Sequence, residues 1–297
     1  MDKMLGKKRY VALFVLPALV LFVGFVLIPL VTTGIYSLFD YDGIGVMKFK
    51  GISNYIQLFT KDRYFPKALI NSFILVGASL LIQLPISLLL AVILARGVKG
   101  EKFFRTVYFI PVVISSMVIG QLWMKIFNSD YGLLNILIRA LGMKDFDYSW
   151  LSQPNTAFIS TVVPSVWQYI GYHMLLFYAG IKSISPDYNE AAQIDGASKW
   201  QISRKITLPL LAPVIKTCIV FSVTGSLRAF DLIYVMTNGG PNHASEVPGT
   251  LMYNNLFRRG LYGYGSAQAF FIVIECLVLS VVINKMFKRA EANVSVL

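Results

Sequence analysis

The stretch EAAQIDGASKWQISRKITLP (residues 190–209) is a polar island in a chain that is otherwise strongly apolar. Of the 297 residues, 56% are hydrophobic and only 14% are charged. Residues 148–181, just before the stretch, contain no Asp, Glu, Lys or Arg. A soluble domain of this length needs more charge to cover its surface. We therefore expect a membrane protein in which this stretch protrudes into water between two spans.

Long runs with few or no charges recur along the chain, and each is long enough to cross a bilayer, which takes about 20 apolar residues. The first run is too long for a signal peptide and has no clear small-x-small cleavage site before Pro29, so it is expected to be a retained helix. The sequence predicts an all-α membrane protein with one transmembrane domain, residues 1–297. Its six spans are expected at about residues 10–39, 68–95, 105–127, 155–181, 206–230 and 263–285.

The distribution of Lys and Arg predicts the orientation of these spans. With both termini in the cytoplasm, the inside segments hold the larger share of the basic residues, as the positive-inside rule requires. The formal net charge of +12 is then explained by cations that flank helix ends and face anionic lipid headgroups, so nucleic-acid binding is not expected. Cys218 and Cys276 lie within spans, which argues against a disulfide framework.

Helix signals divide the polar segment, residues 185–205, into two short helices. Ser185 can cap the first helix, and Pro186 suits its first position. Gly196 can adopt a left-handed conformation that ends it. Ser198 can cap a second helix that continues to Pro209 and re-enters the membrane. The result is a helix, a bend and a helix, a protruding shape suited to docking.

The same segment resembles the EAA signature of the permease subunits of binding-protein-dependent ABC importers. That signature is Glu-Ala-Ala, three residues, Gly, nine residues and Ile-x-Leu-Pro. It is met by Glu190, Ala191, Ala192, Gly196, Ile206, Leu208 and Pro209. The stretches FFRTVYFIPVVIS (103–115), WLSQPN (150–155) and FDLIYVMTNGGP (230–241) are similar to the carbohydrate-uptake branch, in particular its MalF-type subunits, with multiple-sugar and glycerol-phosphate permeases.

The resemblance implies the type I permease fold, a location in the bacterial cytoplasmic membrane, and a set of partners. These are a second homologous permease subunit, two ATPase subunits, an extracytoplasmic sugar-binding protein and membrane lipid. The EAA segment is implied to act as a coupling helix seated in a cleft of the ATPase. The implied coupling residues are Glu190, Ala191, Ala192, Asp195, Gly196, Ile206, Leu208 and Pro209.

The chain carries no motif for an energy source or a catalytic centre of its own. It has neither the G-x-x-x-x-G-K-[ST] phosphate loop nor the H-E-x-x-H metal motif, and it has only two His residues. Gly239–Pro241 lacks the Lys of a phosphate cradle. We expect a protein that is not an enzyme, with no catalytic residue, metal or cofactor of its own, and with ATP and magnesium bound by the partner subunits.

A polar stripe marks the candidate path of the substrate. Ser165, Gln168, Tyr169 and Tyr172 are spaced i, i+3, i+4 and i+7, which places them on one helix face. Within a membrane such a face should meet protein or water, and its aromatic and hydroxyl groups suit a sugar. The alternative is that polar residues join neighbouring helices. By resemblance, these residues match one sugar-contacting face, and a second is matched by Ser222, Gly225, Ser226 and Ala229.

Other polar residues leave alternatives open. Glu275 lies mid-span and is either a proton relay or a carboxyl group that is protonated or paired with another subunit. We expect His173 to be a hydrogen-bonded structural residue, and Arg228 and Asp231 to form a local ion pair. The leading hypothesis is import of a sugar, expected to be an oligosaccharide. The alternatives are a glycerol-phosphate-type permease and an ion-coupled secondary transporter that depends on Glu275.

Overall fold

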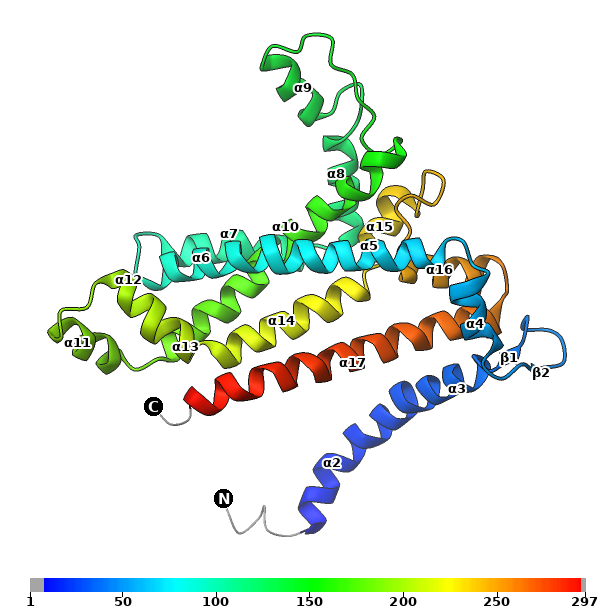
Figure 1. The fold of residues 1–297 in the computed structure, drawn as a ribbon, viewed down its shortest axis with the longest axis horizontal. Coiled ribbons are helices and arrows are strands. Elements are labelled where there is room, and N and C mark those ends of the chain that lie inside the picture. The colour runs from blue at the N-terminus through cyan, green and yellow to red at the C-terminus, as the bar shows by residue number, and fades with distance from the viewer. Residues whose placement is uncertain (1–7, 295–297) are drawn as a thin grey trace. The chain divides into compact units, whose positions relative to one another are not determined.

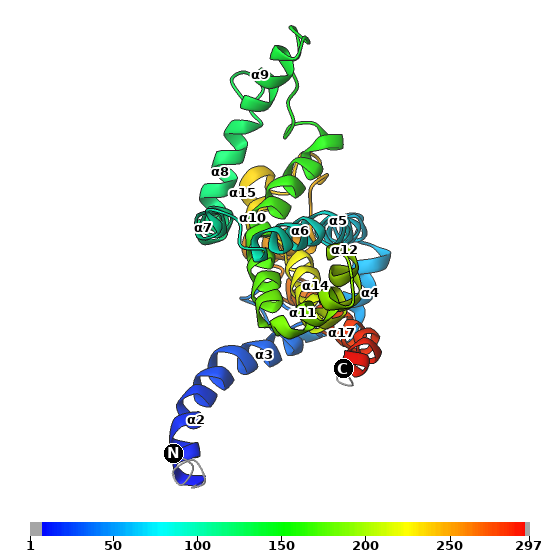
Figure 2. The ribbon, with the colours of Figure 1, turned by 90° about the vertical axis from the view of Figure 1, so that its left-hand side faces the viewer.

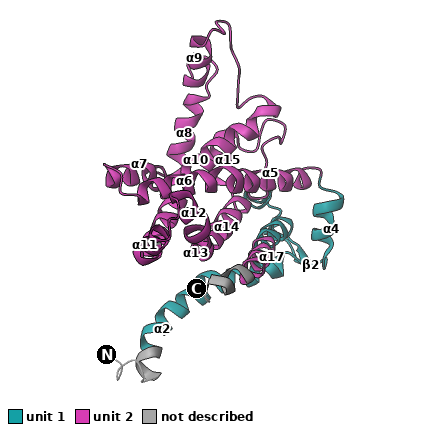
Figure 3. Ribbon diagram, turned by 60° about the vertical axis from the view of Figure 1, so that its left-hand side comes forward, with its two compact units in different colours: residues 1–62, 251–273 teal, residues 63–250, 274–297 magenta. Residues whose placement is uncertain are grey.

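A computed structural model describes residues 8–294, which are mostly helical. Contacts divide the chain into two compact units, coloured separately in Figure 3. Unit 1 comprises residues 1–62 and 251–273, and unit 2 comprises residues 63–250 and 274–297. Each unit is described by itself below, and the single-domain organisation stays a prediction.

Unit 1 begins with an apolar helix that is interrupted once. Its elements are α2 (Lys8–Phe22), the π-helical turn η1 (Val23–Leu27), α3 (Ile28–Tyr36), β1 (Phe39–Asp40), β2 (Lys48–Phe49), α4 (Ser53–Thr60), η4 (Asn254–Arg258), the end of α16 (Pro248–Tyr253) and the start of α17 (Tyr262–Val294). The two strands pair antiparallel, with Phe39 opposite Phe49. No residue from Leu13 to Tyr36 is buried, so the apolar surface of α2 and α3 is available to lipid or to another chain.

The start of α17 packs closely against the rest of unit 1. A Cβ at Gly263 would lie 2.1 Å from the carbonyl oxygen of Phe39, so only glycine permits this approach. The Tyr264 hydroxyl donates to Asp62 Oδ2 at 2.6 Å, and the Phe59 and Phe271 rings meet at 5.4 Å. These contacts join segments that are about two hundred residues apart in the sequence.

Unit 2 is built around one long helix, α10 (Pro154–Ser183), which packs against α6, α7, α14 and α15 (Figures 1 and 2). Its other elements are α5 (Phe65–Ala78), η2 (Ser79–Gln83), α6 (Leu84–Ala95), α7 (Glu101–Val113), α8 (Ser116–Ile126), α9 (Leu133–Ala140), α11 (Pro186–Ile194), α12 (Lys199–Ile202), η3 (Ser203–Thr207), α13 (Leu208–Leu210), α14 (Ala212–Leu227) and α15 (Asp231–Thr237). α16 begins in unit 2 and ends in unit 1, whereas α17 begins in unit 1 and ends in unit 2.

Small residues let the neighbours of α10 approach its backbone. A Cβ at Gly171 would lie 1.9 Å from the carbonyl oxygen of Tyr108 in α7. A Cβ at Gly180 would lie 2.8 Å from a methyl group of Val214 in α14. Membrane helices commonly associate through such small residues, because lipid supplies no hydrophobic force to drive them together. The result is a tightly packed frame on two sides of α10.

Three of the π-helical turns share a position relative to proline. η1, η2 and η3 each end two residues before a proline, at Pro29, Pro85 and Pro209. Proline has no N–H and its ring crowds the carbonyl of the previous turn. The residue before each proline donates instead to the carbonyl five residues earlier, as Leu84 N–H does to Ser79 O. The helices therefore widen locally without breaking.

Four helices of the described chain are long and apolar enough to cross a membrane. They are Leu13–Tyr36, Phe65–Ala95, Ala212–Thr237 and Tyr262–Lys288, and a bent pair formed by α7 and α8 makes a possible fifth span. The 30-residue α10 is long enough but is not among them, and its polar stripe accounts for the lower hydropathy. Six spans and cytoplasmic termini remain predictions.

The region expected to form one span at residues 105–127 is broken. α7 and α8 meet at an angle of 97°, where Ile114 and Ser115 adopt extended backbone conformations. The Ser115 hydroxyl accepts a hydrogen bond from Val118 N–H and so caps α8. Hydropathy alone indicates one continuous helix here. The serine cap within the apolar run instead begins a second helix that points in a different direction.

Gly171→Ala should destabilise the protein, because the new methyl group would force α10 away from Tyr108 of α7. Overpacking of this kind costs about 1–3 kcal/mol. Gly77→Ala is the matched control, since a Cβ at that position meets no atom within 4 Å. Thermal unfolding in detergent compares the two variants. An unchanged midpoint for Gly171→Ala would contradict the close approach.

Candidate functional site

A cavity of about 600 Å³ lies within unit 2, between η2, α10, α14 and the start of α15. This volume is in the range of small-molecule binding sites. The eight residues predicted from the sequence all line it. Ser165, Gln168, Tyr169 and Tyr172 come from α10, and Ser222, Gly225, Ser226 and Ala229 come from α14 and the turn after it. The structure thus brings the two predicted faces together around one space.

Gln168 connects this cavity to the break between α7 and α8. Its Nε2 donates to the carbonyl oxygens of Pro111 and Ile114, at 3.3 and 3.4 Å. These carbonyls lie at the end of α7, where a helix leaves acceptors without intrahelical partners. The bend therefore provides acceptors for one end of the Gln168 amide, while the residue itself lines the cavity.

Several lining residues were missed by the analysis of the sequence. Ser79 and Gln83 project from η2, and the Ser79 and Ser226 hydroxyl oxygens lie 3.0 Å apart. A signal was present: Ser79, Gln83 and Ser87 are spaced i, i+4 and i+8 in an otherwise apolar run. Ser87 itself is held by the carbonyls of Gln83 and Ile170, so it joins α6 to α10.

His173 is hydrogen-bonded, as expected, and it also lines the cavity. Its Nδ1 lies 2.8 Å from Gln83 Nε2 and 3.1 Å from the carbonyl oxygen of Tyr169. Three buried polar atoms of the lining have no hydrogen-bond partner within the described protein. They are Gln168 Oε1, His173 Nε2 and Ser222 Oγ. Buried polar atoms are nearly always paired, and these three belong to residues that line one cavity.

Charge and aromatic groups occupy different parts of the lining. Arg228 and Asp231 both line the cavity and are both exposed, but among the described residues they form no ion pair with each other, contrary to our expectation. Their spacing suggested one helical turn, whereas α14 ends at Leu227 and Phe230 has an extended φ of −146°. Tyr172 and Phe221 supply flat apolar surface, with ring centroids 6.4 Å apart.

The polar segment adopts the predicted helix, bend and helix, beyond the C-terminal end of α10 (Figure 1). The Ser185 hydroxyl caps α11 by accepting from Asp187 N–H, and Gly196 has a φ of +77°. Ser198 and Gln201 form a reciprocal capping box at α12. The capping and left-handed roles predicted for Ser185, Gly196 and Ser198 are confirmed.

Exposure divides the eight predicted coupling residues into two groups. Glu190, Ala191, Asp195 and Gly196 are exposed, and Ala192, Ile206, Leu208 and Pro209 are partly buried. Large apolar side chains are exposed beside the first group, with Ile194 at 86% and Trp200 at 70%. A capped element that presents apolar side chains to water is suited to contact with another protein.

A cluster of polar and aromatic residues ties α7 to α10 near this segment. The Tyr178 hydroxyl donates to Glu101 Oε1, and the Arg105 guanidinium lies 4.6 Å from the centre of the Tyr178 ring. Lys182 Nζ donates to the Ala95 carbonyl oxygen at 2.9 Å. The ends of α6, α7 and α10 are thereby held together where α11 begins.

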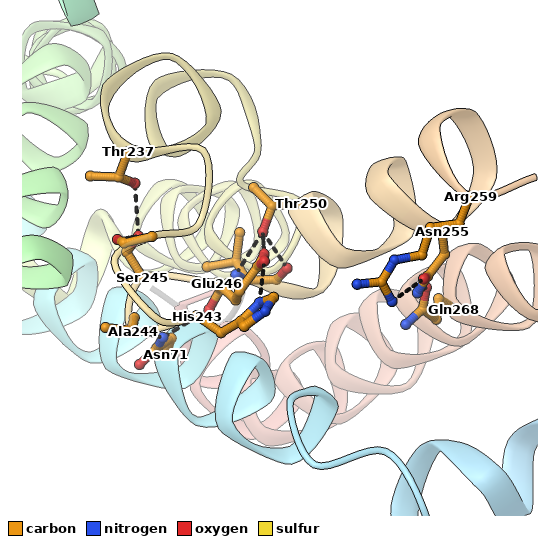
Figure 4. A network of polar contacts seen from close by, with 12 residues as sticks. Asn71, Thr237, His243, Ala244, Ser245, Glu246, Thr250, Asn255, Arg259 and Gln268 are labelled. Atoms are coloured by element: carbon orange, nitrogen blue, oxygen red, sulfur yellow. Dashed lines mark hydrogen bonds and ion pairs between the residues drawn. The ribbon is translucent and has the colours of Figure 1, made fainter. Parts of the chain in front are cut away.

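At the other end of unit 2, the loop after α15 encloses a buried carboxylate (Figure 4). Glu246 is 2% exposed, with one oxygen 3.0 Å from His243 Nδ1 and the other accepting from the Thr250 hydroxyl. Asn71 of α5 donates to the carbonyls of Ala244 and Glu246 at 3.0 and 2.8 Å. These bonds fix the loop that follows the cavity-lining turn. No group of three His, Cys, Asp or Glu side chains in the described residues could hold a metal ion.

The chain is similar to known proteins over most of its length. A family model described as binding-protein-dependent transport system inner membrane component matches residues 83–295. A probable ABC transporter permease of Bacillus subtilis is 39% identical over 282 residues, covering 94% of this chain and 96% of that protein. A trehalose/maltose transport system permease of Thermococcus litoralis is 33% identical over 281 residues, covering 93% and 94%. A chain of a bacterial ABC transporter involved in import of the acidic polysaccharide alginate has a TM-score of 0.82 and 25% identity, covering 97% of this chain and 98% of that one.

Ser198→Ala should loosen α12, because it removes a capping hydroxyl that accepts from Gln201 N–H. Loss of an N-cap costs about 1 kcal/mol, so amide hydrogen exchange over residues 199–206 should quicken about fivefold. Ser198→Thr keeps a capping hydroxyl and serves as the control. Exchange that stays unchanged in Ser198→Ala would show that the capping box does not stabilise the segment.

Proposed function

The chain belongs to the family of binding-protein-dependent transport system inner membrane components, and on that premise we propose that it is a transmembrane subunit of an ATP-driven sugar importer. The resemblance found in the sequence is confirmed, and the protein is a multi-pass membrane protein. An extracytoplasmic binding protein would deliver the sugar. A second, homologous permease subunit and two ATPase subunits would complete the assembly and hold the ATP and magnesium.

The observation that carries this proposal is the cavity in unit 2. Hydroxyl and amide groups of α10 and α14 share it with the rings of Tyr169, Tyr172 and Phe221. Sugars bind through hydrogen bonds to their hydroxyl groups and through contact of their flat apolar faces with aromatic rings. Packing of helices alone would leave little reason for an open space with unpaired polar atoms. The cavity wall therefore fits a sugar better than it fits a dry helix interface.

The topology of the proposal is six spans with both termini in the cytoplasm. α10 would cross the membrane with its polar stripe turned to the cavity, which explains its low hydropathy without exposing polar groups to lipid. The bent pair α7 and α8 would form one broken span. Its carbonyls at the bend are tolerable at membrane depth because Gln168 donates to them. The segment α11–α12 then lies in the cytoplasm.

Coupling to the ATPase is assigned to this cytoplasmic segment. Glu190 would pair with a basic residue of the ATPase, and Ala191, Ala192 and Gly196 would allow close packing. The capped helices would transmit a displacement of the ATPase subunit to α10 and α14. A ligand or partner shifts an equilibrium only if it contacts the two states differently, so the segment must meet the ATPase differently in the inward-open and outward-open states.

One observation keeps a second function in view. Glu275 Oε2 in α17 has no hydrogen-bond partner among the described residues. An ion-coupled secondary transporter would use such a carboxyl group as a relay, and it would import its substrate without ATP. A glycerol-phosphate-type permease fits less well, since Arg228 is the only cation among the described residues that line the cavity and is accompanied by Asp231.

Reconstitution in proteoliposomes tests the proposed function. Uptake of radiolabelled disaccharides is measured with the complete set of subunits and with single subunits omitted. We expect ATP-dependent uptake only in the complete set. The secondary transporter would instead be established by three results together. This chain alone would import the sugar, an uncoupler would abolish that uptake, and the Glu275→Gln variant would show none.

Glu190→Ala and Gly196→Asp should each abolish uptake while the chain still inserts in the membrane. The first removes a charge from the exposed face of α11, and the second places a side chain at a left-handed position with a φ of +77°. Gln193→Ala, another exposed change on α11, is the control. Uptake and membrane content are measured together. Normal uptake by both variants would contradict the coupling role.

Gly225→Trp should block transport by filling the cavity. A Cβ at Gly225 meets no atom within 4 Å, so a side chain there extends into the space without disturbing α14. Gly225→Ala at the same position should leave uptake nearly unchanged. Both assemblies are purified and assayed for sugar uptake. Full uptake by a well-assembled Gly225→Trp importer would place the sugar path elsewhere.

A further inference from the structure

The cavity has a third polar wall, which comes from η2. Pro85 has no N–H, and the chain responds with a widened turn in which Leu84 N–H reaches back to Ser79 O. Ser79 and Gln83 line the cavity from this turn, facing groups of α14 and α10. π-helical turns within α-helices are frequent at functional sites. Here the turn places a buried amide, 3% exposed, against the ring of His173.

Gln83 and the Tyr169 carbonyl hold the ring of His173. The imidazole Nδ1 lies 2.8 Å from Gln83 Nε2, which donates, and 3.1 Å from the Tyr169 carbonyl oxygen, which accepts, so the two contacts favour opposite tautomers. The Nε2 atom is buried and has no partner within the described protein, and His173 is one of the residues that line the cavity. A sugar hydroxyl would accept from Nε2–H in one tautomer and donate to Nε2 in the other, so it suits either state.

Two further unpaired atoms complete a recognition set. Gln168 Oε1 only accepts, and Ser222 Oγ both donates and accepts. Gln168 is 2% exposed, His173 3% and Ser222 4%, so each is firmly held. Gln168 and His173 are five residues apart on α10, about 7.5 Å along its axis. The set thus offers one acceptor and two groups that can each donate or accept, which suits hydroxyl groups.

The charges of the lining indicate which sugars fit. Among the described residues that line the cavity, only Arg228 and Asp231 are charged, and they are opposite in sign and close together in the sequence. The other described residues of the lining, His173 and Gln83 among them, carry hydrogen-bonding, aromatic or aliphatic side chains without a permanent charge. A carboxylate or phosphate placed there would lose its hydration without gaining a cation, which is costly.

We propose that His173, positioned by Gln83, binds a hydroxyl group of the transported sugar, and that the set His173, Gln168 and Ser222 selects an uncharged sugar over an acidic one. This inference rests on the proposed function and names its substrate class. His173 and Gln83 thereby become specificity-determining residues rather than packing residues. The structurally similar alginate transporter handles an acidic polysaccharide, and the inference separates this chain from it.

The test uses the complete importer in proteoliposomes with its own binding protein. Uptake rates are compared for maltose, trehalose, cellobiose, a uronate disaccharide and glycerol 3-phosphate. The best neutral substrate is then compared with its mono-deoxy analogues, in the native assembly and in assemblies with His173→Phe, His173→Gln or Gln83→Leu. For each assembly, the uptake rate of the parent sugar is divided by that of the deoxy analogue. The binding protein is the same in all assemblies, so its own preference cancels when the native ratio is compared with the variant ratio.

In the native assembly, one deoxy analogue should be transported about tenfold more slowly than the parent sugar, as expected for one lost hydrogen bond to a buried group. In His173→Phe the two sugars should differ by less than about twofold, and Gln83→Leu should lie between. His173→Gln keeps an amide donor and should retain most of the discrimination. Ser87→Ala is the matched control, because Ser87 is buried beside Gln83 but does not line the cavity.

The outcomes separate the two proposals. If no sugar is imported by the native complete assembly, the proposed function itself fails. If sugar is imported but the deoxy ratios of the His173 and Gln83 variants equal the native ratio, the inference is overturned while the function stands. Faster import of the uronate or of glycerol 3-phosphate than of any neutral sugar would also overturn it. If the His173→Phe assembly does not form, the same uptake ratios measured for Gln83→Leu and His173→Gln test the inference.

Discussion

A helix with polar groups along one face cannot turn that face to lipid, and α10 is such a helix. Each unpaired polar group in hydrocarbon costs several kcal/mol, so the face must meet protein or an aqueous space. Unit 2 satisfies this requirement by surrounding α10 with α6, α7, α14 and α15. Two glycines, Gly171 and Gly180, admit the neighbouring helices on one part of its surface, and the polar stripe is left to line the cavity.

The break between α7 and α8 belongs to the same arrangement. A broken helix in a membrane needs donors for its free carbonyls, and Gln168 supplies them from α10. The amide oxygen of that residue is left unpaired at the cavity. On the opposite wall, Pro85 widens the helix and brings Gln83 to His173. Backbone irregularities on two sides of α10 therefore set the positions of the groups that would contact a sugar.

Local signals made part of this architecture predictable from sequence. The caps at Ser185 and Ser198 act over two and three residues, and the stripe on α10 follows the helical period, so both were predicted correctly as structure. The wall at Ser79 and Gln83 was missed because a search for charges passes over neutral polar residues in an apolar run. The bend at residues 114–115 was missed because hydropathy does not register a serine cap. The expected ion pair of Arg228 and Asp231 is not formed because α14 ends at Leu227. The end of this helix is decided by tertiary packing, which the local sequence does not show.

The central claim is that the polar face of α10 lines the path of the transported sugar. It is tested most directly by a cryo-electron microscopy structure of the complete importer trapped with sugar between the binding protein and the cytoplasm. The account predicts sugar density in the unit 2 cavity, within hydrogen-bond distance of Gln168, His173 and Ser222. A sugar bound elsewhere, with these three side chains packed against another subunit, would contradict it.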